Sequence, residues 1–175
     1  PAGCRRYASV DGSVPGAAVT WDHHVTGEPI NLDAMPDVID AADFDGVGTT
    51  MADTDAVASV VAVLFGGKSR LPPHVRTVLE AASHRCDQLT PHPKASPDVD
   101  REAVGFHAYV SAALLAASPD AMSETFARLC REVAEAVAKG RPLHVASPAG
   151  EHAGAVARLE REGRLRRVGR IALVD

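Results

Sequence analysis

The feature that most constrains the fold of this chain is an apolar run at residues 56–65, Ala-Val-Ala-Ser-Val-Val-Ala-Val-Leu-Phe. A helix of this composition is apolar on nearly every side, which predicts burial on all faces. Asp53 or Thr54 suits the N-cap, and Gly66-Gly67 ends the run. Residues 45–51, rich in glycine and β-branched residues, read as a strand before it. Strand, acidic turn and buried helix predict a βα unit of an open α/β sheet.

Other segments extend this architecture by their hydrophobic periodicity and their turn residues. We predict further strands at 6–10, 17–21 and 170–174, with an extended segment at 143–146. Predicted helices cover 74–89, 101–117, 120–138 and 151–162, with a helical turn at 37–42 and loops at 25–31 and 90–100. The chain is therefore expected to be a single α/β domain (1–175), with a mainly parallel sheet flanked by helices. Residues 1–90 carry the motifs, and residues 101–175 form a mostly helical C-terminal part.

Bulk properties exclude some classes of function. The net charge is −5, which gives no global electrostatic footprint for a long nucleic acid. Three widely spaced cysteines without a CxxC pattern are typical of reduced thiols, and no signal peptide or run of about 18 apolar residues appears. We expect a cytoplasmic protein that does not insert into membranes. The six arginines between Arg158 and Arg170 indicate a solvated surface, with phosphate binding as the less favoured reading.

The polar cluster Asp22-His23-His24 directly follows the predicted strand 17–21. Open α/β sheets place ligands at the carboxyl ends of their strands. Imidazole and carboxylate suit Mn²⁺, Zn²⁺ or Fe²⁺, so the triplet is a candidate metal or phosphoester site. The competing interpretation is a polar surface turn with two chance histidines.

Further acidic residues lie at corresponding places. Asp53 and Asp55 flank Thr54 where a strand passes into a helix, so both carboxylates can face one pocket, although ordinary capping needs only one of them. Asp11 ends the first predicted strand, as part of an Asp-Gly pair that is usually a turn. The remaining candidates are His84 and Asp87, which share one face of the helix predicted at 74–89. A hydrogen-bonded pair on the helix surface is an equal alternative for them.

These residues together resemble the DHH phosphoesterases, a family named for its Asp-His-His triplet. Asp22-His23-His24 looks like that signature, and residues 50–59 resemble the family's His-x-Asp-x-Asp motif, with Asp53 and Asp55 as its acidic pair. Asp11 is similar to the family's strand-terminal Asp, and Asp87 to its last conserved Asp after a helix. The resemblance covers residues 7–90. Met51 stands at the place of the motif's His, and the order of the two motifs is inverted, as a circular permutation would leave it.

The resemblance implies a metal-dependent phosphoesterase that hydrolyses a phosphomonoester or phosphodiester of a nucleotide or a related small molecule. It implies two Mn²⁺ or Mg²⁺ ions, with His84 as a possible auxiliary ligand. His24 would contact the phosphate or act as the acid, and Asp22 would serve both as a metal ligand and in catalysis. The metal ligands implied are Asp11, Asp22, His23, Asp53, Asp55 and Asp87.

Three alternatives remain open on the sequence. A degenerate relative would bind a phosphorylated ligand or a single metal without hydrolysis, because Met51 removes one ligand. A mononuclear hydrolase or oxygenase would use two histidines and one carboxylate, although His23 and His24 would point opposite ways in an extended segment. A helical interaction protein would rest on residues 101–162, with an exposed apolar stripe and no metal.

Overall fold

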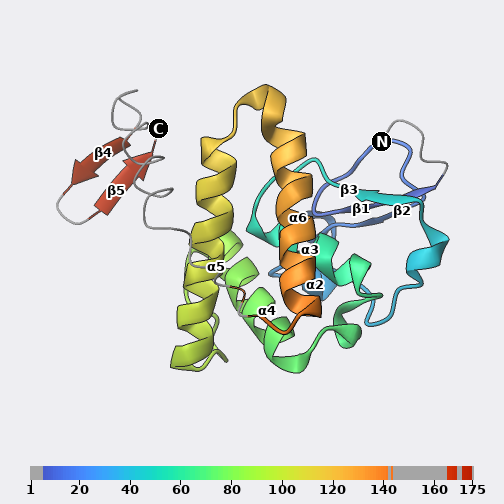
Figure 1. Ribbon diagram of the computed structural model, residues 1–175, viewed down its shortest axis with the longest axis horizontal. Helices are drawn as coiled ribbons and strands as arrows, with labels where there is room; N and C mark the ends of the chain where they lie inside the picture. Colours follow the sequence, from blue (N-terminus) through green and yellow to red (C-terminus); the bar gives the residue numbers. More distant parts are fainter. Residues whose placement is uncertain (1–5, 142, 144–164, 169–170, 175) are drawn as a thin grey trace.

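Three short strands form a parallel sheet in the order β2-β1-β3: β1 (Tyr7–Val10), β2 (Val19–Trp21) and β3 (Gly46–Gly48) (Figure 1). Ser9 of β1 stands opposite Thr20 on one side and Gly48 on the other. This computed structural model describes residues 6–141, 143, 165–168 and 171–174, and the side chains of the first two ranges only. Because all three strands are parallel, the chain leaves each of them at the same edge of the sheet.

The central element is α3 (Thr54–Leu64), in which every residue up to Val63 is buried. It contacts the sheet through β1 and β3, and it contacts each of the long helices α4 (Pro73–Gln88), α5 (Pro97–Ala116) and α6 (Met122–Ala138). Figure 1 shows these helices gathered around α3 on the side away from the strands. The prediction of a buried helix at this place is confirmed up to Val63, and Leu64 at its end is half exposed.

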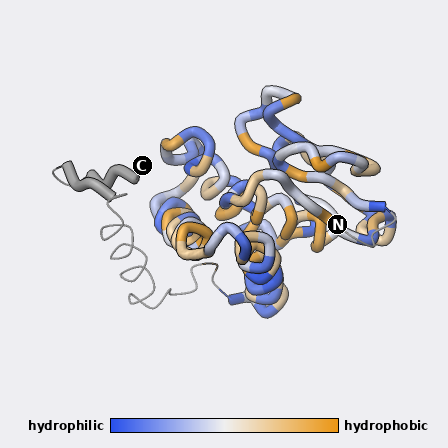
Figure 2. The backbone as a smooth tube through the Cα atoms, turned by 90° about the horizontal axis from the view of Figure 1, so that it is seen from above, coloured by the Kyte–Doolittle hydropathy of each residue, from blue (hydrophilic) through white to orange (hydrophobic). Residues whose placement is uncertain are grey.

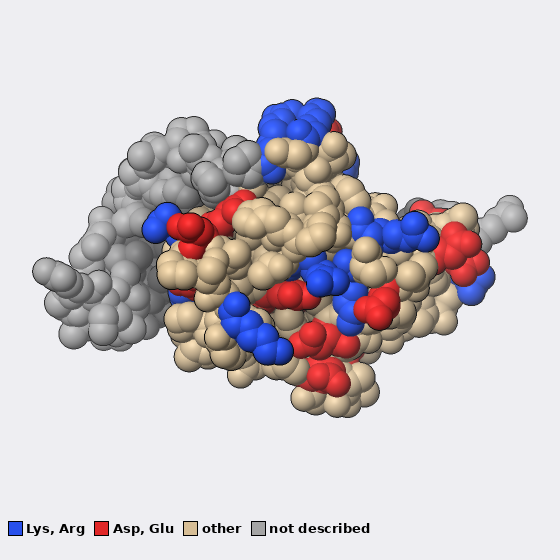
Figure 3. Space-filling model, turned by 90° about the horizontal axis from the view of Figure 1, so that it is seen from below, with Lys and Arg blue, Asp and Glu red and all other residues tan. Residues whose placement is uncertain are grey.

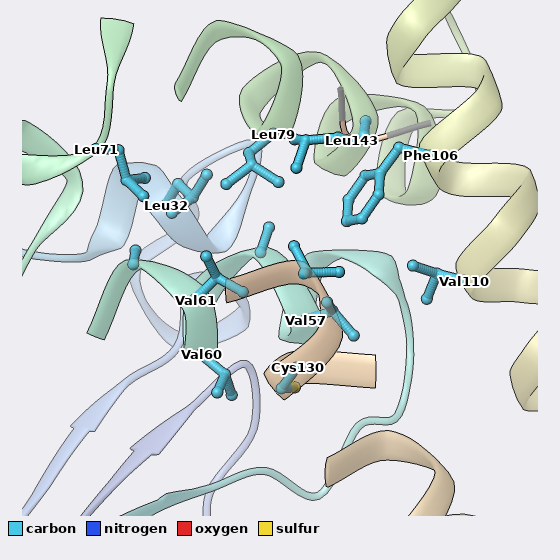
Figure 4. Close-up of a cluster of buried hydrophobic side chains, with 14 of the residues drawn as sticks. Leu32, Val57, Val60, Val61, Leu71, Leu79, Phe106, Val110, Cys130 and Leu143 are labelled. Carbon is cyan, nitrogen blue, oxygen red and sulfur yellow. The ribbon is translucent and has the colours of Figure 1, made fainter. Parts of the chain in front are cut away.

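The core is built from one contiguous set of aliphatic side chains around α3. Figure 4 shows Val57 and Val61 of α3 facing Leu79 of α4 and Phe106 of α5, with Cys130 of α6 closing one side. Figure 2 shows hydrophobic and hydrophilic residues alternating along the outer helices, as expected where one face packs inward and the other meets water. The protein is thus an α/β fold with a parallel sheet flanked by helices and a helical C-terminal part, as predicted.

Two short helices flank the loop predicted at 25–31 and overlap its ends: α1 (His23–Thr26) and α2 (Asn31–Ala34). Asp22 caps α1 by accepting a hydrogen bond from the His24 backbone N–H, and Gly27 ends it at φ 78°, a left-handed conformation that glycine adopts without strain. Residues 27–30 connect these helices, so the predicted loop exists but is shorter than 25–31, because the first helix runs on to Thr26 and the second begins at Asn31.

The prediction of a helical turn at 37–42 is wrong. Only the 3₁₀ turn η1 (Ala41–Asp43) forms there, because the preceding backbone pairs with the loop after α3. Ile39 N–H donates to the Gly66 carbonyl, and Ser69 donates to the Asp37 carbonyl through both its N–H and its hydroxyl. Two further 3₁₀ turns connect the helices, η2 (Lys68–Arg70) and η3 (Pro119–Ala121).

The predicted loop at 90–100 is shorter than expected. The Ser96 hydroxyl accepts a hydrogen bond from the Val99 N–H, so α5 begins at Pro97 rather than at residue 101. Among the described residues, no helix combines the length and the apolar content needed to cross a membrane.

The last two described segments pair as an antiparallel hairpin, β4 (Leu165–Val168) with β5 (Ile171–Val174). The strand predicted at 170–174 is confirmed over Ile171–Val174, and residue 170 lies outside the described residues. β4 was not predicted, because its residues fall in the arginine-rich stretch taken as a surface. The predicted helix at 151–162 and all of the extended segment at 143–146 except Leu143 lie outside the described residues.

Candidate metal centre

The candidate site lies at the carboxyl edge of the sheet, where Asp11 directly follows β1 and Asp22 directly follows β2. Asp11 has φ 46°, a left-handed conformation that non-glycine residues seldom adopt. Its N–H donates to the Trp21 carbonyl at 3.0 Å, and its carbonyl accepts from the Thr49 hydroxyl at 2.8 Å. Contacts from both neighbouring strand ends therefore hold an unusual backbone conformation that keeps the Asp11 carboxylate buried.

His23 carries the imidazole at the centre of the site, and its tautomer is set by its surroundings. Its Nδ1 lies 3.1 Å from the Glu28 carbonyl, which can only accept, so Nδ1 carries the proton in the neutral ring. The Nε2 lone pair then faces Asp11 Oδ1 at 3.3 Å and Asp55 Oδ2 at 3.7 Å. A histidine that donates one ring N–H to a backbone carbonyl and directs its other nitrogen at carboxylates has the usual environment of a metal ligand.

His24 occupies the open side of the site. Its Nδ1 lies 2.9 Å from Asp22 Oδ1 and 3.7 Å from Asp11 Oδ1, and its side chain is 53% exposed. Asp22 Oδ1 also accepts from the His24 N–H at 3.0 Å. The Asp22 carboxylate thus orients the imidazole, and Nε2 is the nitrogen left for a substrate or a metal.

The rings of His23 and His24 lie 4.0 Å apart between centroids, on one turn of α1. The expectation that they point opposite ways is therefore wrong, because the segment is helical rather than extended.

The two carboxylates before and within the first turn of α3 have different partners. Asp53 is the N-cap, and its Oδ1 accepts from the Ala56 N–H at 2.8 Å. Asp55 does no capping: it is fully buried, and its Oδ2 accepts from the Asn31 N–H at 2.8 Å. Capping alone therefore does not account for the acidic pair.

Asn31 ties the site together from the start of α2. Its Oδ1 accepts from the His23 N–H at 3.1 Å, and its Nδ2 donates to the Ser59 hydroxyl at 2.9 Å. One buried side chain thus fixes α1 relative to α3. The sequence analysis missed this role, because a lone Asn after Pro29-Ile30 carries no pattern.

Helix α4 delivers Asp87 and Cys86 near its C-terminal end. Asp87 lies beside Asp55, and Cys86 lies near the backbone N–H groups of Thr54 and Asp55. The sequence analysis counted Cys86 only as one of three widely spaced cysteines and did not select it as a site residue. His84, one turn earlier, is placed elsewhere: its Nδ1 lies 3.1 Å from the Thr90 carbonyl and its ring packs edge-on against His92.

Three overlapping groups of possible ligand atoms result, and within each group the atoms lie within 4.8 Å of one another. His23 is shared by the first two groups and Asp87 by the last two, so the ligands form one continuous row. Of the predicted site residues, Asp22 and His84 belong to none of these groups among the described residues. The groups are Asp11 with His23 and His24, His23 with Asp55 and Asp87, and Asp53 with Cys86 and Asp87.

The electrostatics reflect this concentration of negative charge. Burial, followed by the charge of Asp53, raises the pKa of Asp11 to about 8. Burial, followed by the hydrogen bond and charge of Asp55, raises the pKa of Asp87 to about 9. Burial and then Asp53 raise the pKa of the Cys86 thiol to about 12, although the Thr54 and Asp55 amides act in the opposite direction.

Several of these atoms are buried without a hydrogen-bond partner: both Asp11 oxygens, His23 Nε2, Asp55 Oδ1 and Asp87 Oδ2. Buried polar atoms are rarely left unpaired, and an ion is one of the recognised explanations. Carboxylate and imidazole donors in this number fit Mn²⁺, Fe²⁺ or Zn²⁺, and the carboxylates also fit Mg²⁺. The residues present therefore fit a divalent metal centre.

His107 of α5 is a further residue at the site that the sequence analysis left as structural. Its Nδ1 lies 2.8 Å from the Thr54 hydroxyl, between the two α3 carboxylates in sequence. Burial and then Arg85 lower its pKa, while Asp53 acts in the opposite direction. No signal in the sequence links α5 to this place, because the contact depends on how α5 packs.

Comparison of the chain with protein-family models, with curated proteins and with solved structures gives no significant match. The site is therefore interpreted from its own geometry.

Proposed function

We propose that this protein is a metal-dependent phosphoesterase with a DHH-like site, acting on a nucleotide or another small phosphorylated molecule. The observation that carries the proposal is the buried, unpaired His23 Nε2, which lies 3.3 Å from the unpaired Asp11 Oδ1 and 3.7 Å from Asp55 Oδ2. The chain's resemblance to the DHH motifs supplies the reaction class. Asp11, His23, Asp55 and Asp87 would hold the metal, Mn²⁺ or Mg²⁺, with Asp53 extending the set toward a second ion.

The inverted motif order does not conflict with this proposal. The site needs the carboxyl ends of neighbouring parallel strands, and these meet at one edge whatever their order along the chain. β1 lies between β2 and β3, so the chain crosses the sheet from one flank of Asp11 to the other. Such a crossover is where open α/β sheets form their binding crevices.

Each residue would have a defined task. A bound divalent ion would act as a Lewis acid toward the phosphate and lower the pKa of a water molecule. His24, held at Nδ1 by Asp22, would present Nε2 to the phosphate and pass a proton to the leaving oxygen. Asp22 would orient this ring rather than bind the metal itself, because its Oδ1 is taken up by His24.

The proposed substrate class also rests on surface charge. Figure 3 shows basic and acidic side chains interspersed on the face drawn, without a broad basic stripe along its coloured atoms. Recognition of a long nucleic acid relies on such a stripe. A short nucleotide or a phosphorylated small molecule fits better. We also propose a cytoplasmic location, since the two described cysteines, Cys86 and Cys130, are free thiols.

Hydrolysis of p-nitrophenyl phosphate and of its diester, with Mn²⁺ added, tests the proposal. Asp11→Asn is the decisive variant. Apart from glycine, Asn and Asp tolerate the left-handed conformation best, so this substitution removes only the charge. We expect its rate to fall by about 100-fold or more, as for loss of a group that binds or supports a metal. Asp33→Asn, an exposed carboxylate on α2, is the matched control. Equal rates for Asp11→Asn and wild type, or no hydrolysis with any divalent metal, contradict the proposal.

One observation favours a second candidate, a protein that binds a single metal. Asp11, His23 and His24 already form a two-histidine, one-carboxylate group. Such a protein would bind a phosphorylated ligand without hydrolysis, or use the one metal as a mononuclear hydrolase or oxygenase. The metal content of purified protein separates the two: two ions per chain favour the phosphoesterase, and one ion favours this alternative.

A further inference from the structure

The site has two chemically different ends. At the α1 end the donors are the imidazoles of His23 and His24 with the carboxylate of Asp11. At the α3–α4 end the donors are the carboxylates of Asp53 and Asp87 with the sulfur of Cys86, and these also lie within 4.8 Å of one another. Sulfur differs from oxygen in the metals that it selects, so the two ends need not prefer the same ion.

A cysteine beside two carboxylates is not sufficient evidence for a metal site. The neighbouring buried carboxylates of Asp11 and Asp55 provide independent evidence. Asp11 is 1% exposed, lies beside Asp53, and has no hydrogen-bond partner for either carboxylate oxygen. Asp55 is fully buried, lies beside Asp87, and has no partner for Oδ1. Two buried carboxylates, each with at least one unpaired oxygen, therefore lie beside the two acidic members of the Cys86 group.

The count of charges points the same way. Four carboxyl groups crowd this row, from Asp11, Asp53, Asp55 and Asp87. Once metal binding has displaced their protons they carry four negative charges, and one divalent cation balances only two of them. A buried carboxylate is costly unless it is paired. A second cation at the α3–α4 end would compensate the remainder, and Cys86 is the third donor there.

We propose that Cys86 is a metal ligand, so that the α3–α4 end is a mixed sulfur–oxygen position selective for thiophilic divalent ions such as Zn²⁺, Co²⁺ or Cd²⁺. Binding converts the Cys86 thiol to a metal-bound thiolate and releases its proton to solvent. Hard ions such as Mg²⁺, which prefer oxygen ligands, would gain nothing from the sulfur. This inference rests on the metal centre of the proposed function but not on its reaction.

Co²⁺ titration of the full-length chain tests the inference, because a Co²⁺–thiolate bond gives an intense charge-transfer band in the near ultraviolet that oxygen and nitrogen ligands do not give. The Cys4→Ser background leaves only Cys86 and Cys130 as sources of the band. We expect the band to appear on titration, to vanish in Cys86→Ser, and to persist in Cys130→Ser, whose sulfur lies in the core.

The outcomes separate the inference from the proposed function. Cobalt absorption in the visible range without the charge-transfer band, or a band that persists in Cys86→Ser, overturns the role of Cys86 and leaves the phosphoesterase proposal intact. No Co²⁺ binding of any kind overturns the role of Cys86, while the phosphoesterase proposal is decided separately by hydrolysis with Mn²⁺ or Mg²⁺. Hydrolysis without the band leaves the phosphoesterase standing and removes this inference alone.

A measurement on the unmodified chain covers the case in which Cys86→Ser does not fold. Cys86 is partly exposed, so a small alkylating reagent can reach it. With Zn²⁺ at ten times its dissociation constant, alkylation of Cys86 should slow about tenfold, because about nine-tenths of the sites are then occupied. Peptide mapping by mass spectrometry assigns the modified residue. An unchanged alkylation rate at Cys86 under saturating Zn²⁺ contradicts the inference.

Discussion

Helix α3 has two regions that are both largely buried: the N-cap with the first turn, and the rest of the helix. The two regions are buried for opposite reasons. From Val57 to Val63 the side chains fill the core and contact α4, α5 and α6. Asp55, two residues earlier, is equally buried but has an oxygen without a partner. Burial stabilises the segment from Val57 to Val63 and destabilises the acidic turn. This contrast indicates that the acidic turn is kept for binding.

The largest expected effect concerns the carboxyl groups that surround the acidic turn of α3, and it appears in the pH dependence of stability. The pKa values of Asp11 and Asp87 are raised, to about 8 and about 9, so the folded protein keeps protons that the unfolded chain loses near its ordinary value of 3.8. The contribution of these two carboxyl groups to the stability of the metal-free protein is therefore greatest at low pH, and it is lost as the pH rises toward those values. The slope reaches about 1.4 kcal/mol per pH unit for each such proton.

Urea unfolding between pH 5 and pH 9, with and without Mn²⁺, checks this. Bound metal keeps the carboxylates ionised in the folded state, so the decline should flatten. A metal-free protein whose stability rises across this range contradicts the raised pKa values.

Phe106→Ala examines the core region. Phe106 is fully buried on α5 against the α3 side chains, as Figure 4 shows. Removing the ring should lower the free energy of unfolding by about 3–5 kcal/mol. Metal affinity, measured by calorimetry on the folded fraction, should stay within a few-fold of wild type. A large loss of metal affinity at unchanged stability would show that the two regions are not separable in this way.

Asp55→Asn examines the acidic turn. We expect metal affinity to fall by about 100-fold, equivalent to about 2.7 kcal/mol. The metal-free variant should be more stable than metal-free wild type at pH 8, because one crowded charge is gone. Urea unfolding at that pH and Mn²⁺ titration measure both quantities. Asp33→Asn should change neither. A less stable metal-free variant would mean that Asp55 contributes to folding and not only to binding.

His107→Ala should give the smallest effect. It leaves the Thr54 hydroxyl without its 2.8 Å partner, which should cost about 1 kcal/mol of stability. If His107 only supports the start of α3, metal affinity should hardly change. His74→Ala, an exposed histidine, is the control. A large loss of hydrolysis at unchanged stability would instead place His107 among the groups that contact the substrate.

Part of this picture could be predicted from the sequence, and the limit is physical. The apolar run of α3 reports its burial directly, and the short runs at 6–10 and 17–21, bounded by turn residues, indicate strands. The fold class could therefore be predicted from local pattern. Asp11, His23 and Asp55 could be proposed because parallel strands bring their carboxyl ends together.

Asn31 and His107 could not be proposed, because their contacts come from helix packing and leave no periodicity. His84 was grouped with Asp87 by helical spacing, although the structure pairs it with Thr90 and His92.

The shortness of α1 has a consequence for how a metal ion would enter and leave the proposed site. A helix of four residues has no stability of its own and is held here by its caps and by Asn31. Local opening should therefore release His23 and His24 while α3 stays folded. In hydrogen exchange, the amides of α1 should exchange through such an opening, much faster than those of α3. The rate of metal dissociation would then be set by the opening of one helical turn rather than by unfolding of the protein.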